Sequence, residues 1–144
     1  GVPLVPVSSL AALAQRALDA RRQAGDSAEH EMLCCIDARM GEVYWASFRS
    51  EGALVVPVSE ERIGPPVDVT AAASGLVCLG DAFSIHAGAL EPVLAQAGSV
   101  DVGSTPRARE LLALAAPAVL AGRFVPIEAA LPVYLRGADA WKRA

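Results

Sequence analysis

The residues best suited to chemistry in this sequence surround a predicted hairpin corner within CCIDARMGEVYWASF, residues 34–48. Asp37 follows a short apolar run, and a carboxylate at a strand end can coordinate a magnesium-bound phosphate. A phosphate-binding corner also needs several small residues whose backbone N–H groups point inward. Arg39 and Met40 occupy that space here, which leaves only Gly41. We therefore expect Asp37 to serve the corner itself, by accepting hydrogen bonds from its backbone or by pairing with Arg39.

A second candidate segment is GLVCLGDA, residues 75–82, in which a short apolar run ends in a glycine and an aspartate. If that run forms a strand parallel to the first, its end lies at the carboxyl edge of the sheet, where open α/β sheets bind ligands. The residues that could contact a nucleotide are then Asp37, Gly41, Gly80 and Asp81. The side chains that could face a protein partner are Arg39 and Glu42 in the corner, and Tyr134 and Arg136 in LPVYLR.

Other chemistry has little support in the sequence. Metal-dependent hydrolysis needs clustered ligands, such as two histidines on one helical face, whereas His30 and His86 lie in different segments. We expect His30 to be solvated in a polar loop, and His86 to be a surface or partly buried helix residue. Cys34, Cys35 and Cys78 follow no disulfide or zinc spacing, and they should behave as small hydrophobes in a reducing cytosol. The sequence predicts no catalytic residue, no metal site and no cofactor.

Length and composition describe the setting of these residues. The length of 144 residues predicts one domain, and a composition of 53% hydrophobic and 19% charged residues describes a soluble, alanine-rich globule. The apolar runs are interrupted well short of a membrane span, and the first residues do not form a signal peptide pattern. The formal net charge of −4 argues against a large nucleic-acid surface. A local basic group remains near the C-terminus at Arg136, Lys142 and Arg143.

The elements that must position the candidate residues can be read from hydrophobic periodicity. Ser8 or Ser9 can cap a helix that carries Leu10, Leu13, Ala14 and Ala17 on one face and that Gly25 ends. Its opposite face should hold Gln15, Asp19, Arg22 and Gln23. Residues 32–36, 43–48 and 54–58 are expected to form three strands of an antiparallel meander, with a positive φ at Gly41. In the second strand, Tyr44, Ala46 and Phe48 should share one face, and Val43 and Trp45 the other.

The later part of the chain predicts alternating strand and helix. The apolar run in GLVCLGDA, residues 75–82, reads as the parallel strand, and residues 83–97 read as weakly helical. Thr105 and Pro106 should begin a helix that carries Leu111, Leu114, Ala115 and Ala118 and ends at Gly122, with a kink at Pro117. A meander followed by this alternation predicts half of a ribonuclease-H-like, actin-type (ASKHA) α/β fold.

Several motifs also resemble those of the TsaB (YeaZ) family, which helps to make threonylcarbamoyladenosine on bacterial tRNA. They are GVPLVPVSSLAALA, IDARMGEVYWASF, LGDA, LPVYLR and the terminal AWK, and the likeness extends from Gly1 to about Lys142. DARMGEVYWA and PVYLR are specific in combination. The resemblance implies an actin-like fold of two related lobes. Neither the IDTS-like strand nor the GPGSFTGLR-like segment of the family's N-terminal lobe occurs here.

We therefore expect residues 1–144 to be the C-terminal lobe, and further chain to precede Gly1. Residues 1–25 would be a strand end and connecting helix, residues 31–136 the core of the lobe, and residues 137–144 a tail. The resemblance implies a non-catalytic cytoplasmic scaffold that supports TsaD, together with TsaE, while TsaC supplies threonylcarbamoyl-adenylate. Contact with tRNA would be indirect, and self-pairing would use the absent lobe.

Two function classes stay open at this point. The favoured one is the scaffold, and the alternative is the nucleotide-binding half of an actin-like ATPase or kinase. A glycoprotease activity has no residue set to support it.

Overall fold

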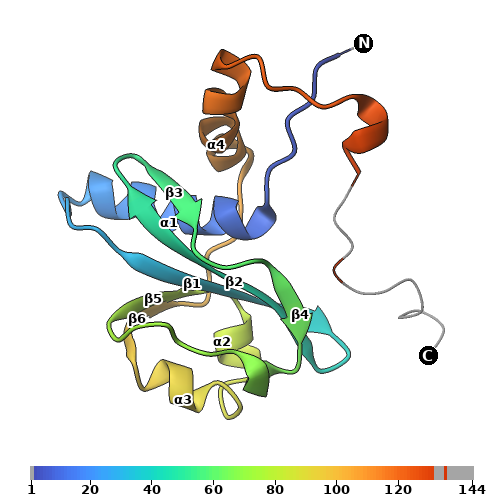
Figure 1. Ribbon diagram of the computed structural model, residues 1–144. Helices are drawn as coiled ribbons and strands as arrows, with labels where there is room; N and C mark the ends of the chain where they lie inside the picture. Colours follow the sequence, from blue (N-terminus) through green and yellow to red (C-terminus); the bar gives the residue numbers. More distant parts are fainter. Residues whose placement is uncertain (1, 132–134, 136–144) are drawn as a thin grey trace.

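A six-stranded mixed sheet forms the centre of the chain (Figure 1). The computed structural model describes residues 2–131 and 135. The strand order is β3-β2-β1-β5-β6, and β4 pairs with residues 43–45 near the start of β2. The strands are β1 (Glu31–Arg39), β2 (Glu42–Glu51), β3 (Leu54–Pro57), β4 (Arg62–Gly64), β5 (Leu76–Leu79) and β6 (Ala97–Asp101). β1, β2 and β3 are antiparallel neighbours, whereas β1, β5 and β6 run parallel, so the predicted meander and parallel crossover are both confirmed.

The side chains of the central strands alternate between two buried layers. In β1, Met32 and Cys34 pack on one face of the sheet, while Leu33 and Cys35 pack on the other. All four are inaccessible to solvent, as the uninterrupted apolar run predicted. The faces predicted for the second strand are also confirmed: Tyr44, Ala46 and Phe48 lie with the first layer, and Val43 and Trp45 with the second.

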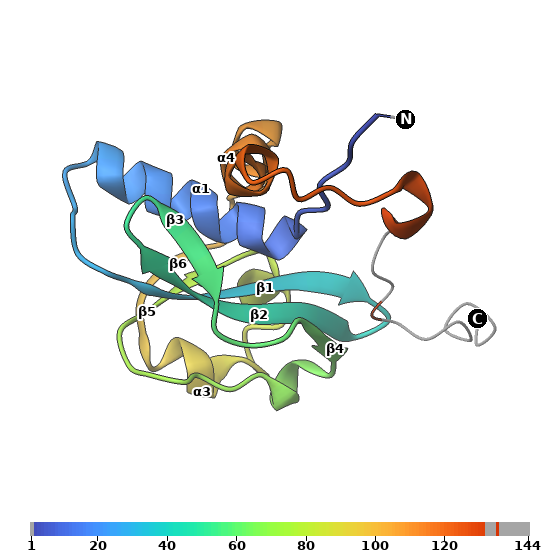
Figure 2. The ribbon, with the colours of Figure 1, turned by 45° about the horizontal axis from the view of Figure 1, so that its top comes forward.

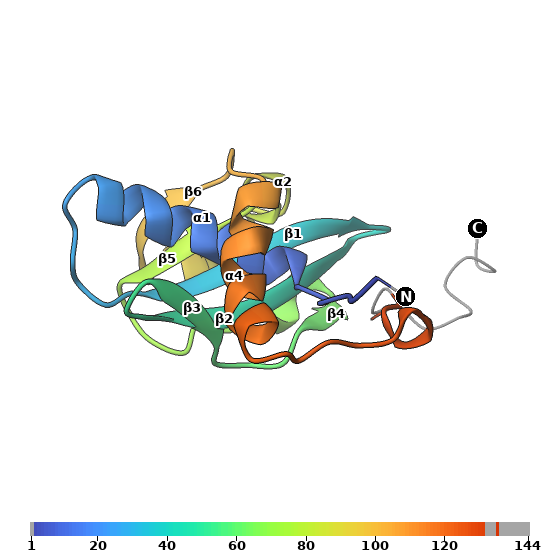
Figure 3. The same ribbon diagram turned by 90° about the horizontal axis from the view of Figure 1, so that it is seen from above.

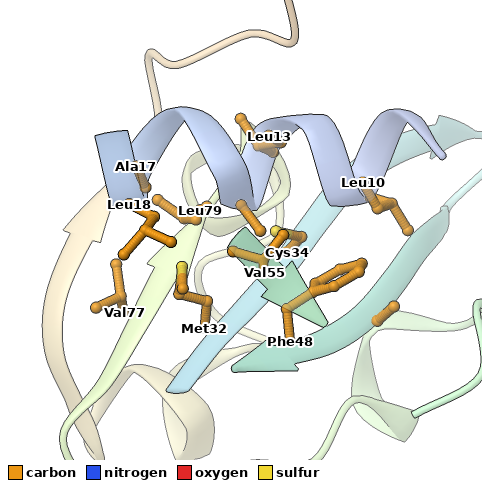
Figure 4. Packing of buried hydrophobic residues seen from close by; sticks show 12 residues of the cluster. Leu10, Leu13, Ala17, Leu18, Met32, Cys34, Phe48, Val55, Val77 and Leu79 are labelled. Carbon is orange, nitrogen blue, oxygen red and sulfur yellow. The ribbon is translucent and has the colours of Figure 1, made fainter. Parts of the chain in front are cut away.

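Helix α1 (Ser9–Gln23) covers the first face (Figure 4). Ser8 caps it by accepting a hydrogen bond from the Ala11 N–H at 3.1 Å, and Gly25 follows its end with φ +84°. The predicted apolar stripe is buried, and Leu18 extends it onto Met32 and Val77. Burial of each such leucine contributes roughly 1.5–3 kcal/mol, which anchors the helix to the sheet.

The predicted polar face of α1 needs one correction. Gln15 is fully buried. Its Nε2 donates to Asp19 Oδ1 and to the Ala53 carbonyl, both at 2.9 Å, and its Oε1 accepts from the Val55 N–H at 3.0 Å. The amide therefore joins α1 to the β2–β3 turn. This packing overrides the exposure that helical spacing alone predicts for Gln15.

The second face of the sheet is covered by short elements. These are η1 (Pro66–Asp68), α2 (Ala82–Ile85) and α3 (Glu91–Leu94). α2 and α3 lie on the side of the sheet opposite α1 (Figure 1), and Figure 2 shows the same for α3. The helical prediction for residues 83–97 is thus correct only for two single turns, because β6 begins at Ala97. β6 is an edge strand with mostly exposed side chains, so it lacks the apolar alternation that would reveal it. β4, three residues long, was not predicted either.

Helix α4 (Ala108–Leu120) lies across the outer side of α1 (Figure 3). It begins later than predicted, at Ala108, and Arg107 in the N-cap position makes no side-chain capping hydrogen bond. The Thr105 carbonyl instead accepts a hydrogen bond from Arg16 at 2.7 Å, which fixes the preceding loop to α1. The predicted end is confirmed by Gly122 at φ +65°, and Pro117 lies inside the helix. Beyond it, η2 (Ile127–Ala129) follows a β-bridge between Val125 and Leu4.

Gly41 offers a direct stability test of the β1–β2 corner. Its φ of +77° confirms the predicted left-handed conformation, and an added Cβ would have no atom within 4 Å. Gly41→Val should therefore lower the free energy of unfolding by roughly 1–2 kcal/mol through backbone strain alone. Urea denaturation of both proteins measures this difference. Equal midpoints and equal slopes would contradict the assigned corner.

Candidate functional site

Three parallel strands end in aspartates at the same edge of the sheet. Asp37 lies near the end of β1, Asp81 follows β5 by two residues, and Asp101 ends β6. The Asp37 N–H donates to Asp81 Oδ1 at 2.9 Å. The structure therefore brings the two predicted segments together at the carboxyl edge, where α/β sheets commonly hold ligands.

The end of β1 is irregular, which sets the direction of Asp37. The register with β2 shifts between Asp37 and Arg39. Arg39, Met40 and Gly41 then take consecutive positive φ values of +65°, +56° and +77°. We expected a positive φ at Gly41 alone. Met40 and Gly41 form the two-residue connection between β1 and β2. A positive φ at both residues of such a connection matches the right-handed twist of a hairpin, and this requirement overrides the preference of Met40 for a negative φ.

Gly80 makes the close approach of β5 to β1 possible. It has φ +116°, and a Cβ built on it would lie 2.1 Å from the Cys35 carbonyl oxygen. Its N–H donates to the Asp101 carbonyl at 2.9 Å. Any side chain would separate the strands, so Gly80 has a structural reason to be glycine. The same approach places Asp81 beside the backbone of Asp37.

The carboxylate of Asp37 is engaged by its neighbours. Its Oδ1 lies 2.9 Å from His86 Nε2, and its Oδ2 lies 3.8 Å from Arg39 Nε. The side chain of Asp37 is 11% exposed and that of His86 is 18% exposed. The hydrogen bond from His86 lowers the pKa of Asp37 below its ordinary value of 3.8, although burial opposes the shift. His86, at the end of α2, is the site residue that sequence reasoning missed.

This hydrogen bond predicts a pH-dependent stability. Because the pKa of Asp37 is lowered in the folded state, the stabilisation is complete above the unfolded value near 3.8 and is lost as pH falls through the folded value. The melting temperature of the parent should exceed that of Asp37→Asn at neutral pH, and the difference should shrink as pH falls below about 4. Thermal melts at a series of pH values measure it.

His86→Asn provides the matched background for that comparison. Without the imidazole, Asp37→Asn should lower the melting temperature less than it does in the parent, because the two side chains interact directly. A difference between parent and Asp37→Asn that stays constant down to the lowest pH would contradict the assigned pair.

Asp101 and Asp81 are also held by local hydrogen bonds. Asp101 Oδ1 accepts from the N–H groups of Gly103 and Ser104 at 3.0 Å, and its Oδ2 accepts from Ser104 Oγ at 2.6 Å. The bond from the Ser104 side chain lowers the pKa of Asp101. The hydrogen bonds of Asp101 thus hold the loop that follows β6, and the hydrogen bond of Asp81 holds the backbone of β1. Residues 2–131 and 135 contain no group of three or more His, Cys, Asp or Glu side chains that could hold a metal ion.

The cysteines and His30 also have side chains capable of nucleophilic or acid–base chemistry. Cys34, Cys35 and Cys78 are buried and unpaired by disulfides, as predicted. Burial raises the pKa of Cys35 to about 12 and that of Cys78 to about 11, and it raises the pKa of Cys34 further. Such thiols stay protonated at neutral pH and are poor nucleophiles. The prediction of a solvated His30 is wrong, because its Nε2 lies 2.8 Å from Asp26 Oδ2 and its side chain is largely buried.

The predicted partner-facing residues divide into two groups. Arg39 and Glu42 are register partners at the hairpin end, where Arg39 is exposed and Glu42 is half-buried. Tyr134 and Arg136 lie outside the described residues. No helix of the described part of the chain is both long enough and apolar enough to cross a bilayer.

Known proteins resemble this chain in sequence and in structure, although no family model matches it. The tRNA threonylcarbamoyladenosine biosynthesis protein TsaB of Escherichia coli (strain K12) is 32% identical over 149 residues, which cover 99% of this chain and 61% of that protein. A Pseudomonas aeruginosa protein described as similar to the peptidase YeaZ is 34% identical, with a TM-score of 0.75 over 93% of this chain and 59% of that chain. YeaZ from the same organism is 31% identical, with a TM-score of 0.72 over 92% and 59% of the two chains.

These likenesses settle the fold class. Sequence identity above 30% accompanies a close structural match in both Pseudomonas proteins. With the observed strand order, they confirm the predicted α/β fold of the ribonuclease-H-like, actin-type class. The chain spans about three fifths of the length of the relatives it matches.

Proposed function

Because this chain belongs to the TsaB/YeaZ family, we propose that it is part of a non-catalytic scaffold in the synthesis of N6-threonylcarbamoyladenosine on tRNAs that read ANN codons. The observation that carries this proposal is the 32% identity to Escherichia coli TsaB across 99% of the chain. The relative's name supports a part in tRNA threonylcarbamoyladenosine biosynthesis. The scaffold role and the class of tRNA are what the family resemblance implies. It includes a cytoplasmic location and no cofactor.

The geometry at the carboxyl edge supports a scaffold over an enzyme. A general base or a magnesium ligand needs a carboxylate that can reach a substrate or an ion. The Asp37 carboxylate is instead bonded to His86 and largely buried, and Asp81 accepts from the Asp37 backbone. The thiols are buried and have raised pKa values. The peptidase likeness named for one Pseudomonas structure belongs to that protein's description.

The proposed partners follow from the family resemblance. TsaD would be the protein that the scaffold supports, TsaE would act with it, and TsaC would supply threonylcarbamoyl-adenylate. Contact with tRNA would be indirect. The candidate contact residues of this chain are Arg39 and Glu42 at the corner, together with Tyr134 and Arg136. Helices of the family's N-terminal lobe would contribute the main TsaD contact and the self-pairing, and neither the IDTS-like strand nor the GPGSFTGLR-like segment of that lobe occurs in these 144 residues.

Co-elution with TsaD tests the proposal. We would replace the matched region of Escherichia coli TsaB with this chain, which gives a full-length chimera. The chimera should co-elute with TsaD in size-exclusion chromatography at micromolar concentration. The 144-residue chain alone should not, because buried anchors dominate the energy of most interfaces and the resemblance assigns them to the other lobe.

Either of two results would overturn part of this account. A folded chimera that fails to co-elute contradicts the scaffold role. Co-elution of the 144-residue chain alone would show that LPVYLR or the DARMGE corner carries the binding. Arg39→Glu would then separate these two, because only the corner contains that residue.

The alternative, a nucleotide-binding half of an actin-like ATPase or kinase, has one observation in its favour. Asp37, Gly80 and Asp81 do converge at the ligand-binding edge of the sheet. Binding of ATP and magnesium to the folded state would raise the melting temperature. We expect no rise for the 144-residue chain or for the chimera. A rise that Asp37→Asn removes would favour the nucleotide-binding function.

A further inference from the structure

We draw no further inference here: the strongest candidate, the exposed edge strand β6 where Arg21 donates a hydrogen bond to Ser99, carries nothing because no feature of the described residues shows what would pair with it.

Discussion

Gly80→Ala should lower the free energy of unfolding by at least about 3 kcal/mol. The added Cβ would lie 2.1 Å from the Cys35 carbonyl oxygen and 2.9 Å from its carbon, and both are backbone atoms. A close-packed interior cannot yield that space without moving β5 away from β1. The φ of +116° adds strain of its own. Separation of the strands would also remove Asp81 from the Asp37 N–H.

Gly41→Ala is the matched control for this prediction. Gly41 also has a positive φ, but no atom lies within 4 Å of an added Cβ. Gly41→Ala should lower the free energy of unfolding by about 1 kcal/mol. Urea denaturation gives both values on one scale. If the two alanine variants are equally stable, the close approach at Gly80 is wrong.

Gln15→Met should lower the free energy of unfolding by roughly 2–4 kcal/mol. The replacement keeps the length of the side chain but removes three hydrogen bonds, those with Asp19, Ala53 and Val55. The Val55 N–H would then be buried without an acceptor, and this desolvation is the larger part of the cost. The β2–β3 turn should also become less protected from hydrogen exchange.

Gln23→Met supplies the control for the buried amide. Gln23 ends the same helix and is exposed, so its replacement should change stability by less than about 0.5 kcal/mol. Comparable losses in the two variants would show that the Gln15 bonds contribute little. Loss of stability without a change in hydrogen exchange at Val55 would show that the turn is held by other contacts.

The sequence predicted the helices and strands whose apolar residues recur with a regular spacing. The capped α1, the three meander strands and the parallel β5 each carry a local pattern of apolar residues. Once β1 and β5 are parallel, their ends must share an edge, so the meeting of Asp37 with Gly80 and Asp81 was predictable. The family motifs led to the same fold, and the solved relatives agree with it.

The remaining features depend on contacts that a single sequence does not reveal. His86 reaches Asp37 only because α2 is a single turn, and AFSI has no periodic pattern that would show this. Gln15 has helical spacing typical of a solvent-facing residue, but the β2–β3 turn folds over it. β6 and β4 are short strands whose pairing decides their conformation. Thr105 was expected to cap α4, but the helix begins at Ala108, and the Thr105 carbonyl accepts a hydrogen bond from Arg16 of α1 in the loop before it.

The candidate site illustrates how one arrangement can suggest two functions. Converging aspartates at a carboxyl edge are typical of nucleotide binding in α/β folds. In this chain the same side chains are occupied in fixing the hairpin, α2 and the loop after β6. The proposed scaffold would thus retain the framework of a ligand site, with its carboxylates used to hold the framework together.

The most direct test of the scaffold proposal is a reconstituted modification reaction. Purified TsaC, TsaD and TsaE are incubated with unmodified tRNA, threonine, bicarbonate, ATP and magnesium, and N6-threonylcarbamoyladenosine is quantified by mass spectrometry of the digested tRNA. The proposal predicts that the chimera carrying this chain in place of the matched region of Escherichia coli TsaB restores product to at least a tenth of the level reached with Escherichia coli TsaB itself. A chimera that melts cooperatively but yields no more product than the reaction without TsaB would contradict it.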